Sequence, residues 1–573
     1  MKKVKFGDKE FVPSQYQEKI FENIEHGTSN MVINAVAGSG KSTTIINALS
    51  LIPNDKKVLF IAFNKDIVES LKEKIGEMQN VDIMTYHSLG YSIIRENMKK
   101  PIEVNDYKYN QYVSSNVCRK DGMNNTKYIS YVKNIKKLID YARFNLAQSA
   151  FEIEKIAKKY NVNVVDDECL FVEETLKWGQ ASLNEIDYTD MVWLPYELDL
   201  KTKSYKYDWI FVDEAQDSSP VQQHLFKKCF KRGARFCAVG DSSQCINAWA
   251  GADEKAFNKF LKMPNTKEFS LPISYRCPVS VINLAKKFVP QIESASNAIM
   301  GEIKYDVSPY MPKMGDMVLC RNTYPLIKLY TDYLRINKKS FIRGKDIGDS
   351  LIEMIDRHST TDGLLNKTLI NDGLFRNLYE HMFKMVDLMI ENNGMTEIEA
   401  YMSEPVMSIY DSIMSMEILS EGLTTVDELK NKIKTIFNEG QNEAICLSTI
   451  HKAKGLESDN VYILAKSLMP SKYAKQDWEI KSEENLEYVA ITRAKKTLNY
   501  ISEDEFKVDR GWEFEKNIKN KFETIRNLLG TSPVKFKGIN TITKHNSKTI
   551  VNNSQPINNK SIGALKFNKF IRK

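Results

Sequence analysis

A glycine turn followed by a lysine and a hydroxyl side chain lies near the amino terminus, in the segment AVAGSGKS from Ala35 to Ser42. A short apolar stretch precedes it, and apolar residues at helical spacing follow it. A strand, a glycine turn and a helix start direct successive backbone N–H groups at one anion. We therefore predict a phosphate-binding loop, with Lys41 against the β- and γ-phosphates of a nucleotide and the Ser42 hydroxyl on Mg²⁺. The loop residues expected to contact the nucleotide are Ala35, Gly38, Ser39, Gly40, Lys41, Ser42 and Thr43.

Two adjacent carboxylates end a second apolar segment. Trp209 to Val212 is typical of a buried strand, and Asp213 and Glu214 follow it directly. One acid at such a strand end can hold Mg²⁺, and the other can take a proton from an attacking water. Alone, a strand end of this kind is often only a helix cap. Together with the upstream loop, it predicts an ATPase site with Asp213 on the metal and Glu214 as the base.

Two arginines far downstream have the chemistry to complete such a site. Arg276 lies in LPISYRCP, and Arg493 lies in EYVAITRAKK, where we expect a helix that begins near Glu484. An arginine supplied across an interface can raise a hydrolysis rate by roughly 10³ to 10⁵. If both arginines reach the nucleotide, ATP lies between two domains, and its hydrolysis can move one domain against the other.

The length and charge of the chain bound its organisation. A chain of 573 residues is too long for one hydrophobic core and predicts two to four domains. The net charge of +7 comes from residues 530–573, which hold nine Lys or Arg and no acid, so the preceding residues carry −2. This Asn-, Ser- and Lys-rich end predicts a disordered tail. It could hold nucleic acid loosely, dock a protein through GALKFNKFIRK, or only solubilise the chain.

Several classes of protein are excluded by what the sequence lacks. It has no run of eighteen apolar residues, and MKKVKFGDKEF does not continue into the apolar segment of a signal peptide. We therefore expect a cytoplasmic protein without a membrane partner. Its eight cysteines form no CxxC pair, so we expect reduced thiols and neither a zinc site nor an iron-sulfur cluster.

Taken together, these motifs resemble those of superfamily 1 helicases of the UvrD type, and they are closest to the F-box helicase branch. Matching motifs follow the family's order from about Pro13 to Ala494, so only the tail lies outside the resemblance. The resemblance implies an α/β fold of two RecA-like P-loop cores with parallel sheets, each interrupted by a helical insertion. It also implies ATP and Mg²⁺ as cofactors and DNA as the partner.

The resemblance assigns roles around the nucleotide. It implies that Gln17 reads the adenine edge, that Tyr275 stacks on the adenine, and that Gly455 and Glu457 approach the nucleotide, with Glu457 at the ribose. A second set would face the γ-phosphate. That set consists of the sensor Gln244 and the two arginine fingers, Arg276 and Arg493.

The resemblance also assigns contacts with a single strand. Aromatic and polar residues of the motifs would line the strand channel, with Trp249 stacking on a base. The residues are Phe63, Asn64, Thr85, His87, Trp249, Thr449 and His451, with Arg321 or Asn322 at the phosphates. Each has an ordinary alternative: the aromatics, including Tyr275, could be core residues, the two histidines could be buried structural ones, and Arg321 could lie in an exposed loop.

Besides Ala35, which stands where a phosphate loop usually has its first glycine, three positions depart from the family pattern. Ala250 stands where relatives usually have arginine, Asn247 stands where they have tyrosine, and Cys277 replaces a small polar residue. The first two lie within two residues of Trp249, so we expect either a weaker hold on the strand there or one fewer stacking step. The catalytic lysine, acids and fingers are unaffected.

The spacing of the motifs predicts the domain boundaries, because two long gaps carry helical patterns and no motif. The expected parts are a first core at 1–98 and 184–268, its helical insertion at 99–183, a second core at 269–346 and 441–529, its insertion at 347–440, and the tail at 530–573.

The function these motifs predict is an ATP-dependent motor that acts as a monomer on single-stranded and tailed duplex DNA. The resemblance implies 3′-to-5′ travel and duplex unwinding in replication, repair or recombination. One alternative is a translocase that mainly displaces bound proteins. A small-molecule P-loop kinase would leave STIHKAKGLE and YVAITRAKK unexplained, and a non-catalytic scaffold would not need a complete set of hydrolytic residues.

Overall fold

The computed structural model describes residues 4–6, 9–62, 65–75, 78–98, 100–117, 125–160, 162, 166–246, 255–359, 365, 373–393, 395–438, 443–474, 476–507 and 511–530. The chain forms two compact units. The first comprises residues 1–326, 337–340 and 441–508, and the second comprises 327–336, 341–440 and 509–573. The predicted tail lies outside the described residues from 531 onward.

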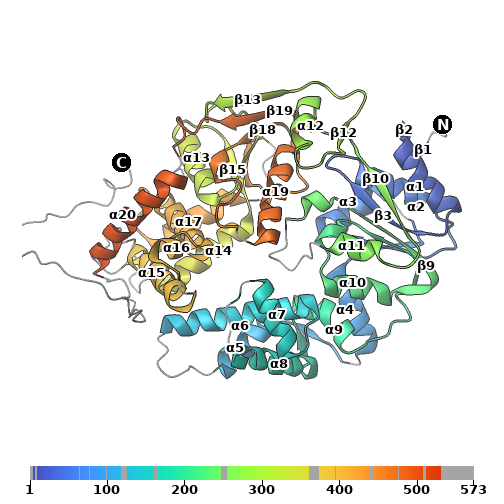
Figure 1. Cartoon of the computed structure of the whole chain (residues 1–573), viewed down its shortest axis with the longest axis horizontal. Coiled ribbons are helices and arrows are strands. Elements are labelled where there is room, and N and C mark those ends of the chain that lie inside the picture. The colour runs from blue at the N-terminus through green and yellow to red at the C-terminus, as the bar shows by residue number, and fades with distance from the viewer. Residues whose placement is uncertain are drawn as a thin grey trace, which may run out of the picture. The chain divides into compact units, whose positions relative to one another are not determined.

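A six-stranded parallel sheet organises the first part of the first unit (Figure 1). Its strands stand in the order β10-β3-β9-β8-β4-β5, and every neighbouring pair is parallel. The bounds are β3 Asn30–Ala35, β4 Val58–Ala62, β5 Val81–Thr85, β8 Tyr207–Val212, β9 Phe230–Gly240 and β10 Thr266–Leu271. The predicted strands before the phosphate loop and before the two acids are therefore confirmed as β3 and β8.

Helices cover both faces of this sheet, because alternate residues of its strands belong to two separate hydrophobic clusters. Met31 and Phe60 lie in the cluster of α1 and α2, whereas Val32 and Leu59 lie in the cluster of α4 and α9. Burial on both faces accounts for the unbroken apolar sequence of β4, which is buried at every position. The helices are α1 Gln15–His26, α2 Lys41–Ser50, α3 Lys65–Ile75, α4 Tyr86–Asn97, α9 Tyr188–Glu197, α10 Pro220–Lys228 and α11 Ala256–Leu261.

Between α4 and α9 the chain forms a group of helices (Figure 1). They are α5 Lys108–Asn116, α6 Asn125–Asn145, α7 Ala150–Lys159 and α8 Asp166–Ala181, flanked by the paired short strands β6 Glu103–Val104 and β7 Glu185–Ile186. A buried charge cluster joins this group to α9. Arg143 of α6 donates to both oxygens of Asp187 at 2.8 Å, and Asp190 accepts from Arg143 at 2.9 Å and from Lys108 at 2.7 Å.

The first unit also contains five parallel strands of a second sheet, in the order β13-β19-β18-β14-β17. Their bounds are β13 Glu302–Val307, β14 Met317–Cys320, β17 Ile445–Thr449, β18 Ser458–Ile463 and β19 Ala494–Ile501. Helices α12 Val279–Ala285 and α19 Asp477–Ile491 supply residues to the hydrophobic core of this sheet. Short strands β11 Ile273–Ser274 and β12 Glu293–Ser294 pair beside it. Two parallel sheets with helices confirm the predicted α/β class and are consistent with two RecA-like cores.

The second unit is mainly helical (Figure 1). Phe522 of α20 packs edge-on against the rings of Phe383, Tyr401 and Tyr410, with centroids 5.0 to 5.9 Å apart. The elements are most of α13 Thr323–Arg335 and β15 Ser340–Arg343, then α14 Lys345–His358, α15 Leu374–Asn393, α16 Glu397–Tyr401, α17 Glu404–Leu419, α18 Val426–Ile436, β16 Phe437–Asn438 and α20 Gly511–Leu529. In the described part of the chain, no helix is long and apolar enough to cross a membrane.

The buried charge cluster generates a stability prediction. We expect Arg143→Met to lower the free energy of unfolding by about 3–5 kcal/mol, because the substitution takes the bidentate cation from the buried carboxylate of Asp187. The matched control is Lys158→Met, which removes an exposed ion pair with Glu154 and is expected to cost less than about 0.5 kcal/mol. Urea unfolding of both variants measures the difference, and equal transitions would contradict the prediction.

Candidate active site

The segment between β3 and α2 has the backbone that a phosphate loop needs. Gly38 and Gly40 both lie in the left-handed region, with φ of 71° and 76°, which favours glycine there. Helix α2 begins at Lys41, so its first N–H groups are oriented toward the loop. The buried hydroxyl of Ser39 has no hydrogen-bond partner. These features fit a bound triphosphate, although the individual ligand contacts stay a prediction.

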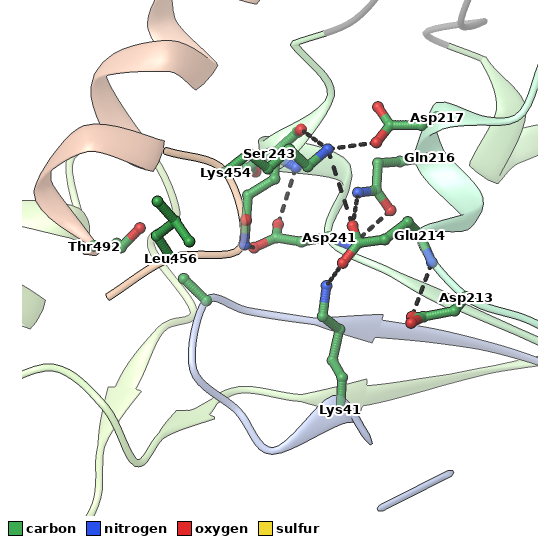
Figure 2. A network of polar contacts seen from close by, with 12 residues as sticks. Lys41, Asp213, Glu214, Gln216, Asp217, Asp241, Ser243, Lys454, Leu456 and Thr492 are labelled. Carbon is green, nitrogen blue, oxygen red and sulfur yellow. Dashed lines mark hydrogen bonds and ion pairs between the residues drawn. The ribbon is translucent and has the colours of Figure 1, made fainter. Parts of the chain in front are cut away.

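The two predicted acids stand where β8 ends, close to the lysine of the loop (Figure 2). Glu214 has φ of 48°, a left-handed conformation that is uncommon for a residue with a side chain and that often marks functional sites. Its N–H donates to Asp213 Oδ1 at 2.9 Å, and its Oε1 accepts from Lys41 Nζ at 2.7 Å. The structure therefore brings the predicted lysine and the predicted base into direct contact.

Electrostatics separate the two acids. Burial, reinforced by the charge of Glu214, raises the pKa of Asp213. Burial also disfavours ionisation of Glu214, but the charges of Lys41 and then Lys454 hold the pKa of Glu214 below its ordinary value. A pair of carboxyl groups with opposite shifts can divide their tasks. The ionised Glu214 suits a base, and the buried carboxyl of Asp213 suits a cation, which Mg²⁺ would supply together with the exposed hydroxyl of Ser42.

The segment after β11 lies directly against the phosphate loop. The N–H of Tyr275 donates to the carbonyl of Gly38 at 2.9 Å. A Cβ at Gly38 would lie only 2.5 Å from Cβ of Arg276, so this approach requires glycine. The ring of Tyr275 is 53% exposed and lies beside Gly40, which suits the predicted stacking on adenine. Arg276 Nε donates to Glu457 Oε2 at 2.6 Å, which brings the first finger and the predicted ribose contact together.

The second arginine lies just past the end of α19 and not within the helix. The helix begins at Asp477, before the expected start near Glu484. Arg493 is buried and donates to the carbonyl oxygens of Val489 at 2.8 Å and Leu456 at 3.1 Å. It also donates to Gln244 Oε1 at 3.4 Å. Burial, and then the charge of Arg276, lower the pKa of Arg493 to about 10. The two fingers therefore lie close enough to repel each other, as expected if they serve one anion.

Three further residues belong to this network, and the sequence motifs did not single them out. Lys454 forms an ion pair with Asp217, lies 4.0 Å from Glu214 Oε2, and donates to the carbonyl of Gln244 at 2.9 Å (Figure 2). Asp241 follows β9 as Asp213 follows β8, and it accepts from Gln244 Nε2 at 2.6 Å. The third is Tyr488 of α19. The sequence could have indicated Asp241, because an acid follows an apolar strand there, and Lys454, because this lysine lies within STIHKAKGLE.

Two further predicted nucleotide contacts, Gln17 and Gly455, are described in the structure. Gln17 is buried in the first turn of α1, where its Oε1 accepts from the N–H of Ser14 and its Nε2 donates to Thr44 Oγ1, both at 2.9 Å. This places the predicted adenine reader beside the helix of the phosphate loop. Gly455 has φ of 88°, which places it in the region favourable to glycine.

The predicted strand contacts of the first sheet are only partly described. Phe63, Asn64, Trp249 and the departure positions Asn247 and Ala250 lie outside the described residues.

Two first-sheet candidates are described, and both have local contacts. Thr85 is buried and caps α4 by accepting from the N–H of Ser88 at 3.1 Å. The ring of His87 lies edge-on to Tyr188, with centroids 6.3 Å apart. Contact with nucleic acid at these positions stays a prediction.

Three predicted strand contacts of the second sheet lie near its carboxyl edge. Thr449 ends β17, and His451 follows it. Burial, and then the charge of Arg321, lower the pKa of His451 to about 3, so its ring is neutral at physiological pH. Arg321 donates to Glu483 Oε1 from Nε at 3.0 Å and from Nη2 at 2.7 Å. In this structure, the guanidinium of Arg321, which we expected to contact strand phosphates, is therefore paired with the carboxylate of Glu483.

Family comparisons match both sheets. Residues 16–265 match the UvrD/REP helicase N-terminal domain, and residues 444–501 match the UvrD-like helicase C-terminal domain. The chain belongs to the UvrD-like helicases of superfamily 1. The site of this helicase is thus formed by both matched regions, since Lys41 and Glu214 lie in the first and Lys454 and Arg493 lie in the second.

Curated relatives of this helicase match along most of its length. The ATP-dependent DNA helicase Rep of Buchnera aphidicola subsp. Acyrthosiphon pisum is 22% identical over 82% of this chain and 91% of its own. The ATP-dependent DNA helicase PcrA of Bacillus subtilis is 22% identical over 82% of this chain and 80% of its own. The ATP-dependent DNA helicase PcrA of Staphylococcus aureus is 22% identical over 82% of this chain and 81% of its own.

The contacts of Lys454 generate a prediction about hydrolysis. We expect Lys454→Met to lower the rate of ATP hydrolysis about tenfold or more, since Asp217 loses its buried cation and Glu214 loses part of the charge that keeps it ionised. The matched control is Lys496→Met, which removes an exposed ion pair with Asp459. Steady-state hydrolysis by the three proteins tests this. Equal rates in the two variants would rule out a special role for Lys454.

Proposed function

We propose that this helicase hydrolyses ATP between its two parallel sheets and uses each cycle to move 3′ to 5′ along single-stranded DNA, unwinding duplex DNA that carries a 3′ tail. Membership of the family makes the protein an ATP-driven DNA helicase. The direction, the tailed substrate and the residues that act are the proposal. The observation that carries it is the ion-pair network in which Lys454, from the second sheet, meets Glu214 and Asp217 of the first (Figure 2).

The proposed chemistry starts from the contact between Lys41 and Glu214. In this structure the two side chains neutralise each other at 2.7 Å. The phosphates of ATP would compete for Lys41, and Glu214 would then be released to orient a water and accept its proton. Mg²⁺ held by Ser42 and Asp213 would neutralise phosphate charge. Arg276 and Arg493 would stabilise the charge that develops on the γ-phosphate.

Coupling to movement follows from the origin of these groups. Lys41, Glu214 and Gln244 come from the first sheet, whereas Arg276, Lys454 and Arg493 come from the segments around the second sheet. Loss of the γ-phosphate removes an anion that both sets share, so the relative stability of the closed and open arrangements changes with each hydrolysis.

The strand contacts in this proposal are those that the motifs predict. We place Phe63, Trp249, Thr449 and His451 on the single strand. Each base stacked on an aromatic would contribute about 1–3 kcal/mol. Monomeric action, the domain boundaries, a role in replication or repair, and a partner for the tail are parts of the same proposal.

The first test concerns hydrolysis itself. We expect single-stranded DNA to stimulate ATP hydrolysis and Lys41→Ala to reduce the stimulated rate about 100-fold or more, because the substitution removes the cation of the phosphate loop. The matched control is Lys57→Ala, which removes a half-exposed pair with Asp82 in the same sheet. If single-stranded DNA does not change the rate of ATP hydrolysis, the result would favour a small-molecule kinase or a scaffold over a motor.

The second test concerns direction. We expect strand displacement from a duplex with a 3′ single-stranded tail and none from the same duplex with a 5′ tail. Parallel removal of a protein bound to the single strand, on an otherwise identical substrate, separates unwinding from protein displacement. Unwinding that starts only at the 5′ tail would refute the proposed polarity.

A further inference from the structure

Tyr488 connects α19, the helix that ends just before the finger Arg493, to the phosphate loop. The family motifs assign no role to this tyrosine. Its side chain extends from α19 and is completely buried in the hydrophobic core of the second sheet. The same cluster contains Val36 and Ala37 of the phosphate loop. The tyrosine therefore lies where the loop of the first sheet packs into the core of the second.

The hydroxyl of Tyr488 makes two hydrogen bonds to the first sheet. It accepts from the N–H of Ala37 at 3.0 Å and donates to Asp241 Oδ2 at 3.2 Å. Burial, with the charge of Asp241, holds the pKa of Tyr488 well above its ordinary value, so the hydroxyl keeps the proton that it donates. Ala37 is 1% exposed, so without this acceptor its N–H would lose a partner in a buried place.

These bonds continue to two of the three groups that would sense the γ-phosphate, Gln244 and Arg493. Asp241 Oδ2, which accepts from Tyr488, also accepts from Gln244 Nε2 at 2.6 Å. Gln244 Oε1 in turn accepts from Arg493, which lies just past the end of the helix that carries Tyr488. A continuous chain of hydrogen bonds thus links Tyr488 of α19, through Asp241 and Gln244, to Arg493 just past the end of the same helix.

A second contact from the same helix acts on the same loop. Asn485 Nδ2 donates to the carbonyl of Cys245, the residue after Gln244, at 2.9 Å. Helix α19 therefore holds the sensor segment from two positions, and the Tyr488 hydroxyl also holds the phosphate loop.

We propose that Tyr488 is a positioning residue that fixes the phosphate loop relative to Gln244 and Arg493, and so lets the site distinguish ATP from ADP. The idea rests on the proposed function, since both sensors need a γ-phosphate to act on. Nucleotides without that phosphate would meet the loop and the predicted adenine and ribose contacts, but not Gln244 and Arg493. Loss of the Tyr488 hydroxyl therefore acts selectively on the triphosphate state.

The test is Tyr488→Phe, which keeps the ring and removes both hydrogen bonds. We expect kcat for DNA-stimulated hydrolysis to fall about tenfold or more, while the Kd for ADP changes less than about threefold. The preference for ATPγS over ADP should fall by about the same factor as kcat. A tyrosine that acted only by packing would not be affected by this change, because the ring stays.

The matched control is Tyr207→Phe. Tyr207 is also completely buried and also donates to an aspartate, Asp82, at 2.7 Å, but it stands at the start of β8, the opposite end from Asp213. We expect its kcat and nucleotide preference to match those of the unmodified protein. Thermal unfolding of both variants monitors folding.

A second variant changes the other end of the link. Asp241→Asn leaves α19 intact and is expected to cause the same selective loss, so the test does not depend on one variant being stable. Adding Tyr488→Phe to Gln244→Ala should lower kcat little beyond Gln244→Ala alone, because both act through one chain of contacts.

Two results would overturn the inference: an unchanged kcat in Tyr488→Phe, or equal weakening of ADP and ATPγS. If the unmodified protein itself does not hydrolyse ATP, the proposed function fails first, and that outcome is recognisable without any variant.

Discussion

The burial of several carboxylates at the carboxyl end of β8 is the constraint on which the site depends. Asp213, Glu214 and Asp217 lie within five residues, and their side chains are largely or fully shielded from water. Buried like charges are unfavourable unless cations accompany them. One cation is Lys41, from the first sheet, and the other is Lys454, from the second. The pairing of Asp217 therefore depends on a residue of the second core.

Balanced charge of this kind suits a cycle in which an anion repeatedly enters and leaves. A polyanionic nucleotide with its metal brings both negative and positive charge into the same small volume. Lys41 stands at the start of α2 beside the phosphate loop and can exchange Glu214 for a phosphate, whereas Lys454 is paired with Asp217. The two lysines thus have different tasks, although both contact the acidic segment. Asp241 and Tyr488 connect this charge network to the backbone of the loop.

Local patterns in the sequence predicted the elements that hold the chemistry. The strand, glycine turn and helix around Lys41, and the strand before Asp213, follow from residues that are adjacent in the chain, so periodicity and turn chemistry suffice. The two parallel sheets followed from the family resemblance. The capping role of Thr85, which accepts from the N–H of Ser88, was not predicted, because the family motifs assigned Thr85 only to the strand channel.

The parts that could not be predicted depend on which distant segments become neighbours. Lys454 and Asp217 are far apart in the chain, as are Tyr488 and Ala37, and no periodicity relates either pair. Arg321 shows the same limit, since its bidentate partner Glu483 lies on α19, 162 residues further along the chain. Contacts of this kind follow only from the tertiary packing of distant segments.

The presence of Val36, Ala37 and Ile246 in the core of the second sheet has a thermal consequence. Separation of the two sheets would wet these apolar side chains, so the hydrophobic effect contributes to holding them together. That contribution weakens on cooling. The ion pairs of Lys41 and Lys454 are largely shielded from water, so salt screens them little. Cooling therefore weakens the apolar part of this interface and leaves its ion pairs in place, and a cold-adapted relative would need a stronger apolar part.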